Sequence, residues 1–204
     1  MKKILPVFAY LFHPLFIPAY ATLFYFLITQ NFFYRHEIYL VFIQVLILTV
    51  LLPLSIFYLL RSLGMLKSRM TDKKERRMPL AIYTLLLLFL IKYSFSVFVV
   101  PELYYYFLGT LISAVLALAL VLFGYKASLH MMGIASLTLF VISISAYYHI
   151  RFLGIIAFFI ICAGMVGSSR LAAKNHSLGE VALGALLGII PQVLLWFVWL
   201  LPAL

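Results

Sequence analysis

Long apolar segments separated by short polar turns make up most of this chain. Each segment holds about 20 residues, the length that an α-helix needs to cross the hydrocarbon core of a bilayer. The seven predicted spans are residues 4–29, 38–60, 80–99, 103–124, 129–147, 152–168 and 178–203. Backbone groups in lipid must be hydrogen-bonded within their own segment, so we expect every span to be helical. A membrane β-barrel would require alternating strands of about ten residues, whereas these segments are continuously apolar.

The composition agrees with a membrane protein and excludes a soluble domain. Hydrophobic residues make up 67% of the chain and charged residues only 10%, a balance that no soluble domain of this size shows. We therefore predict an all-α fold, a polytopic membrane helical bundle of about six to seven transmembrane helices, forming one domain over residues 1–204. The N-terminal segment is similar to a signal peptide, but Pro6, Pro14 and Pro18 interrupt its apolar core, which favours a retained first helix. The single Cys162 rules out an intrachain disulfide.

Basic residues are distributed unevenly between the two ends of the predicted bundle. If the seven helices alternate in direction, the N-terminus and segments 61–79, 124–128 and 169–177 lie on one side of the membrane. Twelve of the fifteen Lys and Arg residues fall on that side: Lys2, Lys3, Arg61, Lys67, Arg69, Lys73, Lys74, Arg76, Arg77, Lys126, Arg170 and Lys174. Cytoplasmic loops are enriched in Lys and Arg, so this side is predicted to face the cytoplasm across the cell (inner) membrane. The net charge of +10 then favours membrane lipids and phosphate as partners, and not nucleic acid.

The turn before the last apolar segment carries residues suited to phosphate chemistry. Arg170 presents a planar fork that can hold two phosphate oxygens, although an arginine at a helix end also anchors the helix at the interface. His176 and Glu180 are four residues apart and share one helix face, so the carboxylate can orient the imidazole for attack. Ser177 and Glu180 also form a capping box, and the sequence does not separate these two roles of Glu180.

Two further polar clusters lie on the same predicted side. Lys126, Ser128 and His130 stand at the start of the fifth segment, and a helix N-terminus favours anions. The alternative for His130 is an ordinary interfacial histidine. Arg69, Arg76 and Arg77 lie in the long polar loop, where the alternative is a solvated basic loop that fixes topology.

The cluster around His176 resembles the third signature motif of the type 2 phosphatidic acid phosphatase superfamily. The motif reads Ser-Arg, five residues, His, three residues and an acid, and it is matched by Ser169, Arg170, His176 and Glu180. The family normally ends this motif in Asp, whereas this chain has Glu. This motif is the most specific part of the resemblance, which covers about residues 67–188.

The other two clusters resemble the remaining motifs of that superfamily less closely. The second motif, Pro-Ser-Gly-His, keeps Ser128 and His130 in register but has alanine and leucine in place of proline and glycine. The first motif, Lys, six residues and Arg-Pro, keeps its spacing in Arg69 and Arg76, although the proline follows three residues later at Pro79. Two predicted spans separate each cluster from the next, so all three clusters return to the same membrane surface.

The resemblance implies a metal-independent phosphatase without a cofactor, acting on a lipid phosphate or diphosphate of the phosphatidate, phosphatidylglycerophosphate or polyprenyl diphosphate type. It implies that His176, oriented by Glu180, attacks phosphorus to form a phosphohistidine, and that His130 protonates the leaving oxygen. The residues expected to bind the phosphate are Arg170, Arg76, Arg77, Arg69, Lys126, Ser128 and Ser169. One alternative is a non-catalytic relative that binds or transports lipid. Another is a prenyltransferase, which would need two Asp-rich magnesium motifs, whereas Asp72 is the only aspartate.

Four polar residues inside the predicted spans are interpreted as structural. Lys92 is expected to extend its ammonium group toward an interface. His13, Gln44 and Gln192 are expected to form hydrogen bonds between helices. Gly184 and Gly188 are expected to allow close packing of the last helix.

Overall fold

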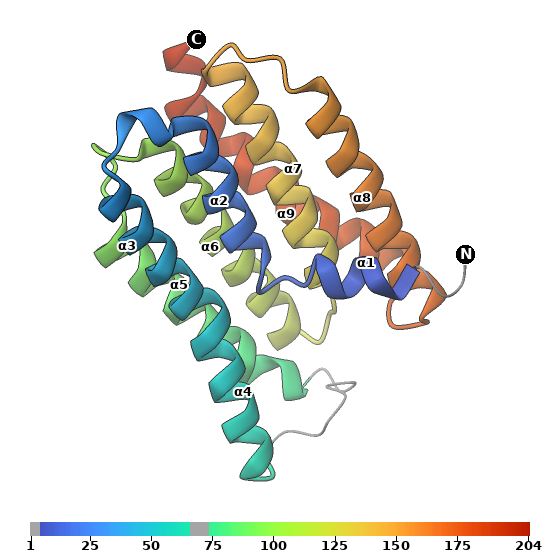
Figure 1. Ribbon diagram of the computed structural model, residues 1–204. Helices are drawn as coiled ribbons and strands as arrows, with labels where there is room; N and C mark the ends of the chain where they lie inside the picture. The colour runs from blue at the N-terminus through green and yellow to red at the C-terminus, as the bar shows by residue number, and fades with distance from the viewer. Residues whose placement is uncertain (1–4, 66–73) are drawn as a thin grey trace.

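A computed structural model describes residues 5–65 and 74–204, and every regular element in these ranges is a helix (Figure 1). Six helices are long and apolar enough to cross a membrane: Arg35–Ser62, Arg77–Ser94, Pro101–Leu122, Leu129–Tyr147, Leu153–Ala172 and Leu178–Ala203. The first combines α3 (Arg35–Leu46), the π-helical turn η2 (Ile47–Leu51) and α4 (Leu52–Ser62). The next four are α5, α6, α7 and α8, and the last combines α9 (Leu178–Trp199) with the short η4 (Leu201–Ala203). The predicted all-α multi-pass membrane bundle is therefore confirmed.

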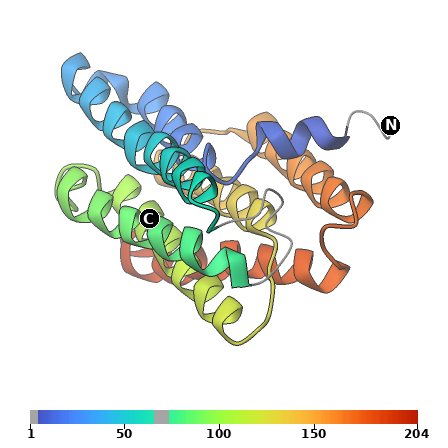
Figure 2. The same cartoon turned by 90° about the horizontal axis from the view of Figure 1, so that it is seen from below.

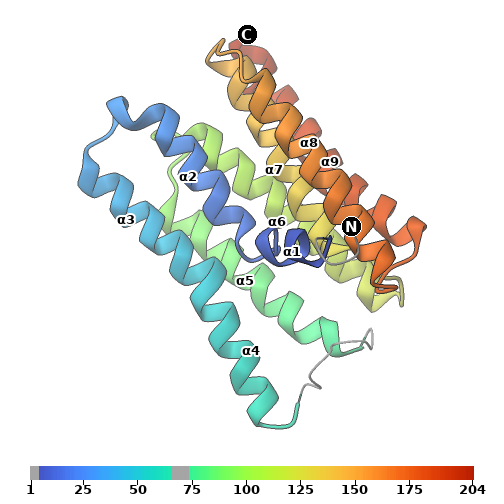
Figure 3. The same ribbon diagram turned by 45° about the vertical axis from the view of Figure 1, so that its right-hand side comes forward.

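The N-terminal segment does not form the single span expected over residues 4–29. It is divided into α1 (Leu5–Leu11) and α2 (Ile17–Thr29) by a turn that contains Pro14. Proline lacks a backbone N–H and its ring clashes with the preceding turn, so a helix breaks at such a position. α1 lies across the long helices, while α2 runs along them (Figures 1 and 3). With 13 residues, α2 is about 20 Å long and too short to span a bilayer. The prediction of seven spans was wrong in this segment.

The loops expected on one side of the membrane do gather at one end of the bundle. We call it the basic end and define it by η3 (Lys74–Arg76), residues 123–128 and residues 173–177. Figure 2 views the molecule from this end. The loops 95–100 and 148–152 lie at the opposite end, as does the C-terminus (Figure 1).

Hydrogen bonds between buried polar groups hold the opposite end together. Glu102 at the start of α6 is 3% exposed and accepts hydrogen bonds from the hydroxyl groups of Tyr25 (3.0 Å) and Tyr148 (2.7 Å). These bonds join α2, α6 and the end of α7. Lys92 lies exposed near the end of α5, with its ammonium nitrogen 5.2 Å from the centre of the Tyr93 ring, in agreement with its expected position.

Close packing of α9 against α7 fixes the geometry of the basic end. A Cβ atom at Gly184 would collide with the carbonyl oxygen of Ser128, and one at Gly188 with the carbonyl oxygen of Met132. Glycine at these positions lets the two backbones touch, as the sequence predicted. At the start of both helices, the Ser128 N–H donates to the Glu180 carbonyl oxygen at 3.0 Å. The N-termini of α7 and α9 are thereby held side by side.

Polar contacts hold the middle of α9 as well. Gln192 Nε2 donates to the Tyr106 carbonyl oxygen of α6 at 3.0 Å, which is the expected bond between helices. The Gln44 side chain is exposed on α3 and has no hydrogen bond within residues 5–65 and 74–204, so that part of the expectation was wrong. α9 is therefore fixed on two sides, by α7 and by α6.

The reversal between α8 and α9 is itself well defined. Lys174 adopts a left-handed conformation with φ of 54°, and its N–H donates to the Leu171 carbonyl oxygen at 3.0 Å. The Asn175 N–H donates to the Arg170 carbonyl oxygen at 3.3 Å, which completes a Schellman motif. Ser177 then caps α9. Two ordered helix ends therefore hold His176 between them.

Candidate functional site

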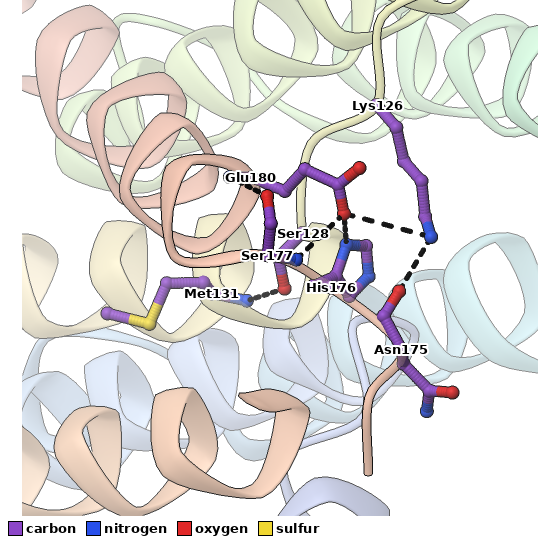
Figure 4. Close-up of polar contacts among 7 residues, drawn as sticks. All are labelled: Lys126, Ser128, Met131, Asn175, His176, Ser177 and Glu180. Carbon is purple, nitrogen blue, oxygen red and sulfur yellow. Dashed lines mark hydrogen bonds and ion pairs between the residues drawn. The ribbon is translucent and has the colours of Figure 1, made fainter. Parts of the chain in front are cut away.

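Glu180 is the centre of a polar cluster at the basic end (Figure 4). Its Oε2 atom accepts a hydrogen bond from the Ser177 N–H at 3.3 Å, and its own N–H donates to Ser177 Oγ at 3.3 Å, which confirms the capping box. The same Oε2 atom lies 2.8 Å from Nδ1 of His176. The two roles left open by the sequence therefore coexist on one carboxylate oxygen.

His176 is held with one ring nitrogen engaged. Its side chain is only 5% exposed, and Glu180 binds Nδ1, so the neutral ring has its proton on Nδ1 and a lone pair on Nε2. Burial lowers the pKa of His176, the hydrogen bond to Glu180 raises it, and the charges of Lys126 and Arg76 lower it, with a net decrease. The imidazole is therefore neutral at pH 7, the state in which Nε2 is a nucleophile.

Two cations from separate loops lie beside this pair. Lys126 Nζ is 3.7 Å from Glu180 Oε2 and donates to the Asn175 carbonyl oxygen at 2.6 Å. Arg76 is half-buried, and burial lowers the pKa of its guanidinium while Glu180 raises it. Because Arg76 also acts electrostatically on His176, the first and third clusters come close to each other in space.

The remaining residues of the site lie around His130, in the first turn of α7. Arg170, His13 and His176 all interact electrostatically with its ring. The rings of His130 and His13 meet edge-to-face, with centroids 5.1 Å apart and planes at 83°. Arg170 Nε is buried and has no hydrogen-bond acceptor among the described residues. His176 thus connects the Glu180 cluster to a second cluster formed by His130, Arg170 and His13.

Three residues of the expected phosphate site are buried or make other contacts. Ser128 is fully buried and its Oγ atom accepts from the Met131 N–H at 3.4 Å, so it caps α7. Arg77 Nη2 donates to the Leu122 carbonyl oxygen at 3.4 Å, at the end of α6. Ser169 is buried within α8. Arg69 lies outside the described residues.

His13 is the residue of this site that the sequence interpretation missed. The sequence predicts for it a hydrogen bond between helices and no contact with a ligand. The Pro14 that follows it was the available signal, because a break in the helix can carry a side chain to the end of the bundle. Burial and the charge of Arg170 lower the pKa of His13, so this ring is also neutral at pH 7.

The charge balance of the site suits a phosphate group. Three cations, Arg76, Lys126 and Arg170, are offset in part by the single carboxylate of Glu180, and the neutral His13 and His176 add no charge. The resulting charge of about +2 matches a phosphate monoester, which carries about −1.5 to −2 near neutral pH. Within residues 5–65 and 74–204, no three His, Cys, Asp or Glu side chains group together as metal ligands.

No protein-family model matches the chain, and neither the curated proteins nor the solved structures gave a match.

Proposed function

We propose that this protein is a membrane-embedded, metal-independent phosphatase that hydrolyses a lipid phosphate or diphosphate through a phosphohistidine. The observation that carries the proposal is the arrangement of His176, with Glu180 on Nδ1 and cations from two other loops around the pair. Residues from clusters far apart in the sequence meet at one end of a membrane bundle, as the resemblance to the type 2 phosphatidic acid phosphatase superfamily implies.

The proposed reaction has two steps. Nε2 of His176 attacks phosphorus, a P–N bond forms as the bond to the leaving oxygen breaks, and His130 supplies the proton to that oxygen. Water then attacks phosphorus and gives a proton to His130, while the P–N bond breaks to free His176 and release inorganic phosphate. Arg170 and Arg76 stabilise the charge on the phosphoryl oxygens in both steps. Lys126 contributes to the same field through its contact with Glu180.

Phosphate release by the purified protein tests this function. Phosphatidate, phosphatidylglycerophosphate and a polyprenyl diphosphate should be offered in mixed micelles, with a chelator present. At least one of them should yield phosphate at a rate that the chelator does not change. Failure to hydrolyse any of the three by a folded protein would argue against a phosphatase of this kind.

One observation favours a second candidate, a non-catalytic relative that binds lipid phosphate. Ser128, which the family uses as a phosphate ligand, is fully buried here and caps α7. In this case the same lipids should bind without phosphate release.

Glu180→Gln separates the two roles of the carboxylate. Glutamine also completes a capping box, so the unfolding temperature should change little. The charge that stabilises the His176 imidazolium is lost, so turnover should fall by about a hundredfold. The carboxylate raises the pKa of His176, so its removal should move the acidic limb of the kcat/KM profile to lower pH. Wild-type turnover and an unmoved profile would leave Glu180 as a helix cap only.

We propose that the basic end faces the cytoplasm, because the Lys and Arg residues are concentrated there. Single cysteines at exposed positions test this, namely Tyr125→Cys at the basic end and Arg151→Cys at the opposite end, both in a Cys162→Ala background. A membrane-impermeant maleimide should label position 151 in intact cells and position 125 only after lysis. The reverse pattern would show that the site faces away from the cytoplasm.

A further inference from the structure

The N-terminal segment forms one wall of the candidate site, although none of the three motifs includes it. α1 packs against α8, the helix that carries Arg170 (Figure 1). At the turn that follows α1, the His13 ring meets the His130 ring edge-to-face. The break after α1 therefore brings a third histidine beside the proposed proton donor.

The hydrogen bonds of His13 define which ring nitrogen can donate. The Leu15 N–H donates to His13 Nδ1 at 3.4 Å, so the neutral ring has its proton on Nε2. This donor has no acceptor among residues 5–65 and 74–204. Arg170, whose charge acts on the His13 ring, has its own buried Nε donor without an acceptor in the same part of the chain. Buried donors are normally satisfied, so the unpaired Nε of Arg170, together with the Nε2–H of the neighbouring His13, indicates a site for an oxygen-rich ligand close to His130.

We propose that His13 is a further phosphate-contacting residue, which donates its Nε2–H to a phosphoryl oxygen held by Arg170. The proposal rests on the proposed function, because the phosphate is the one that His176 attacks. A neutral imidazole provides a donor here without placing another charge next to the guanidinium. Such a donor stabilises the transferred phosphoryl group as negative charge develops on its oxygens.

Binding of inorganic phosphate to the purified full-length protein tests the contact without requiring turnover. His13→Phe keeps a ring for the contact with His130 but removes the donor, and phosphate affinity should fall about tenfold. His13→Gln restores a side-chain N–H and should recover most of that loss. His36→Phe is the matched control, since His36 is exposed at the start of α3, and it should bind phosphate like the wild type. Wild-type affinity in His13→Phe would overturn the proposal.

The outcomes also distinguish this proposal from the proposed function. If the wild type binds phosphate but hydrolyses no lipid phosphate, the phosphatase assignment fails, while the affinities of the variants still decide the role of His13. If His13→Phe does not fold, carbethoxylation of the wild type decides it. Saturating phosphate should protect His13 from modification, as measured by mass spectrometry. Equal modification with and without phosphate, or no phosphate binding by the wild type, would overturn the proposal.

Discussion

Replacing His176 with alanine should abolish phosphate release from every lipid substrate that the wild type hydrolyses. The side chain is 5% exposed and Glu180 binds its Nδ1, so this change removes an oriented imidazole, the proposed nucleophile. Nucleophile deletions in enzymes with covalent intermediates cost about 10⁴-fold or more in turnover. The remaining site still has three cations, so affinity for inorganic phosphate should change much less than turnover does.

A trapping experiment shows whether the loss is chemical. The wild type, quenched at alkaline pH during turnover, should have an acid-labile phosphoryl group on the peptide that contains His176. His176→Ala should have none. His36→Ala changes an exposed histidine at the opposite end of the bundle and should retain full activity. Phosphate release at the wild-type rate by His176→Ala would rule out the proposed mechanism.

Hydropathy was sufficient to predict the long helices, because an apolar segment that crosses lipid as a single span must be helical. The helix predicted over residues 129–147 has those same bounds in the structure. The N-terminal segment differed because a proline shows where a helix can break, whereas the packing of both halves decides whether it does. α2 is held by tertiary contacts, with Ala21 and Tyr25 almost fully buried in the core.

The spacing of the motifs predicted which residues would meet at the site, but it did not predict their contacts. The roles of Glu180 could not be separated in advance, because one oxygen serves the helix cap, His176 and Lys126 together. Ser128 matched a motif letter, but its burial depends on α9, whose backbone it touches at Gly184. His13 belongs to no motif, and only the path of the chain brings it to His130.

Gly188→Ala should destabilise the bundle by about 1–3 kcal/mol, the usual cost of overpacking. Its Cβ would collide with the Met132 carbonyl oxygen and lie 3.2 Å from the Cβ of Ala135. Backbone atoms of α7 cannot move aside alone, so the two helices must separate. Gly164→Ala is the matched control, because a Cβ there meets nothing within 4 Å on α8. Both changes gain similar helix propensity, so the difference between them measures the packing.

Gly184→Ala should combine this destabilisation with a defect in the site. The new Cβ would press on the backbone of Ser128, whose N–H binds the Glu180 carbonyl oxygen at 3.0 Å. Since separating α7 from α9 relieves both collisions, Gly184→Ala and Gly188→Ala together should cost less stability than the sum of the two single changes.

Unfolding by SDS in mixed micelles measures the stabilities of these variants, and phosphate release measures the integrity of the site. Equal stability of Gly188→Ala and Gly164→Ala would show that α7 and α9 are not in backbone contact. If the contact exists, Gly184→Ala should lose more activity than Gly188→Ala at the same loss of stability, because it moves the helix ends that hold His130 and Glu180.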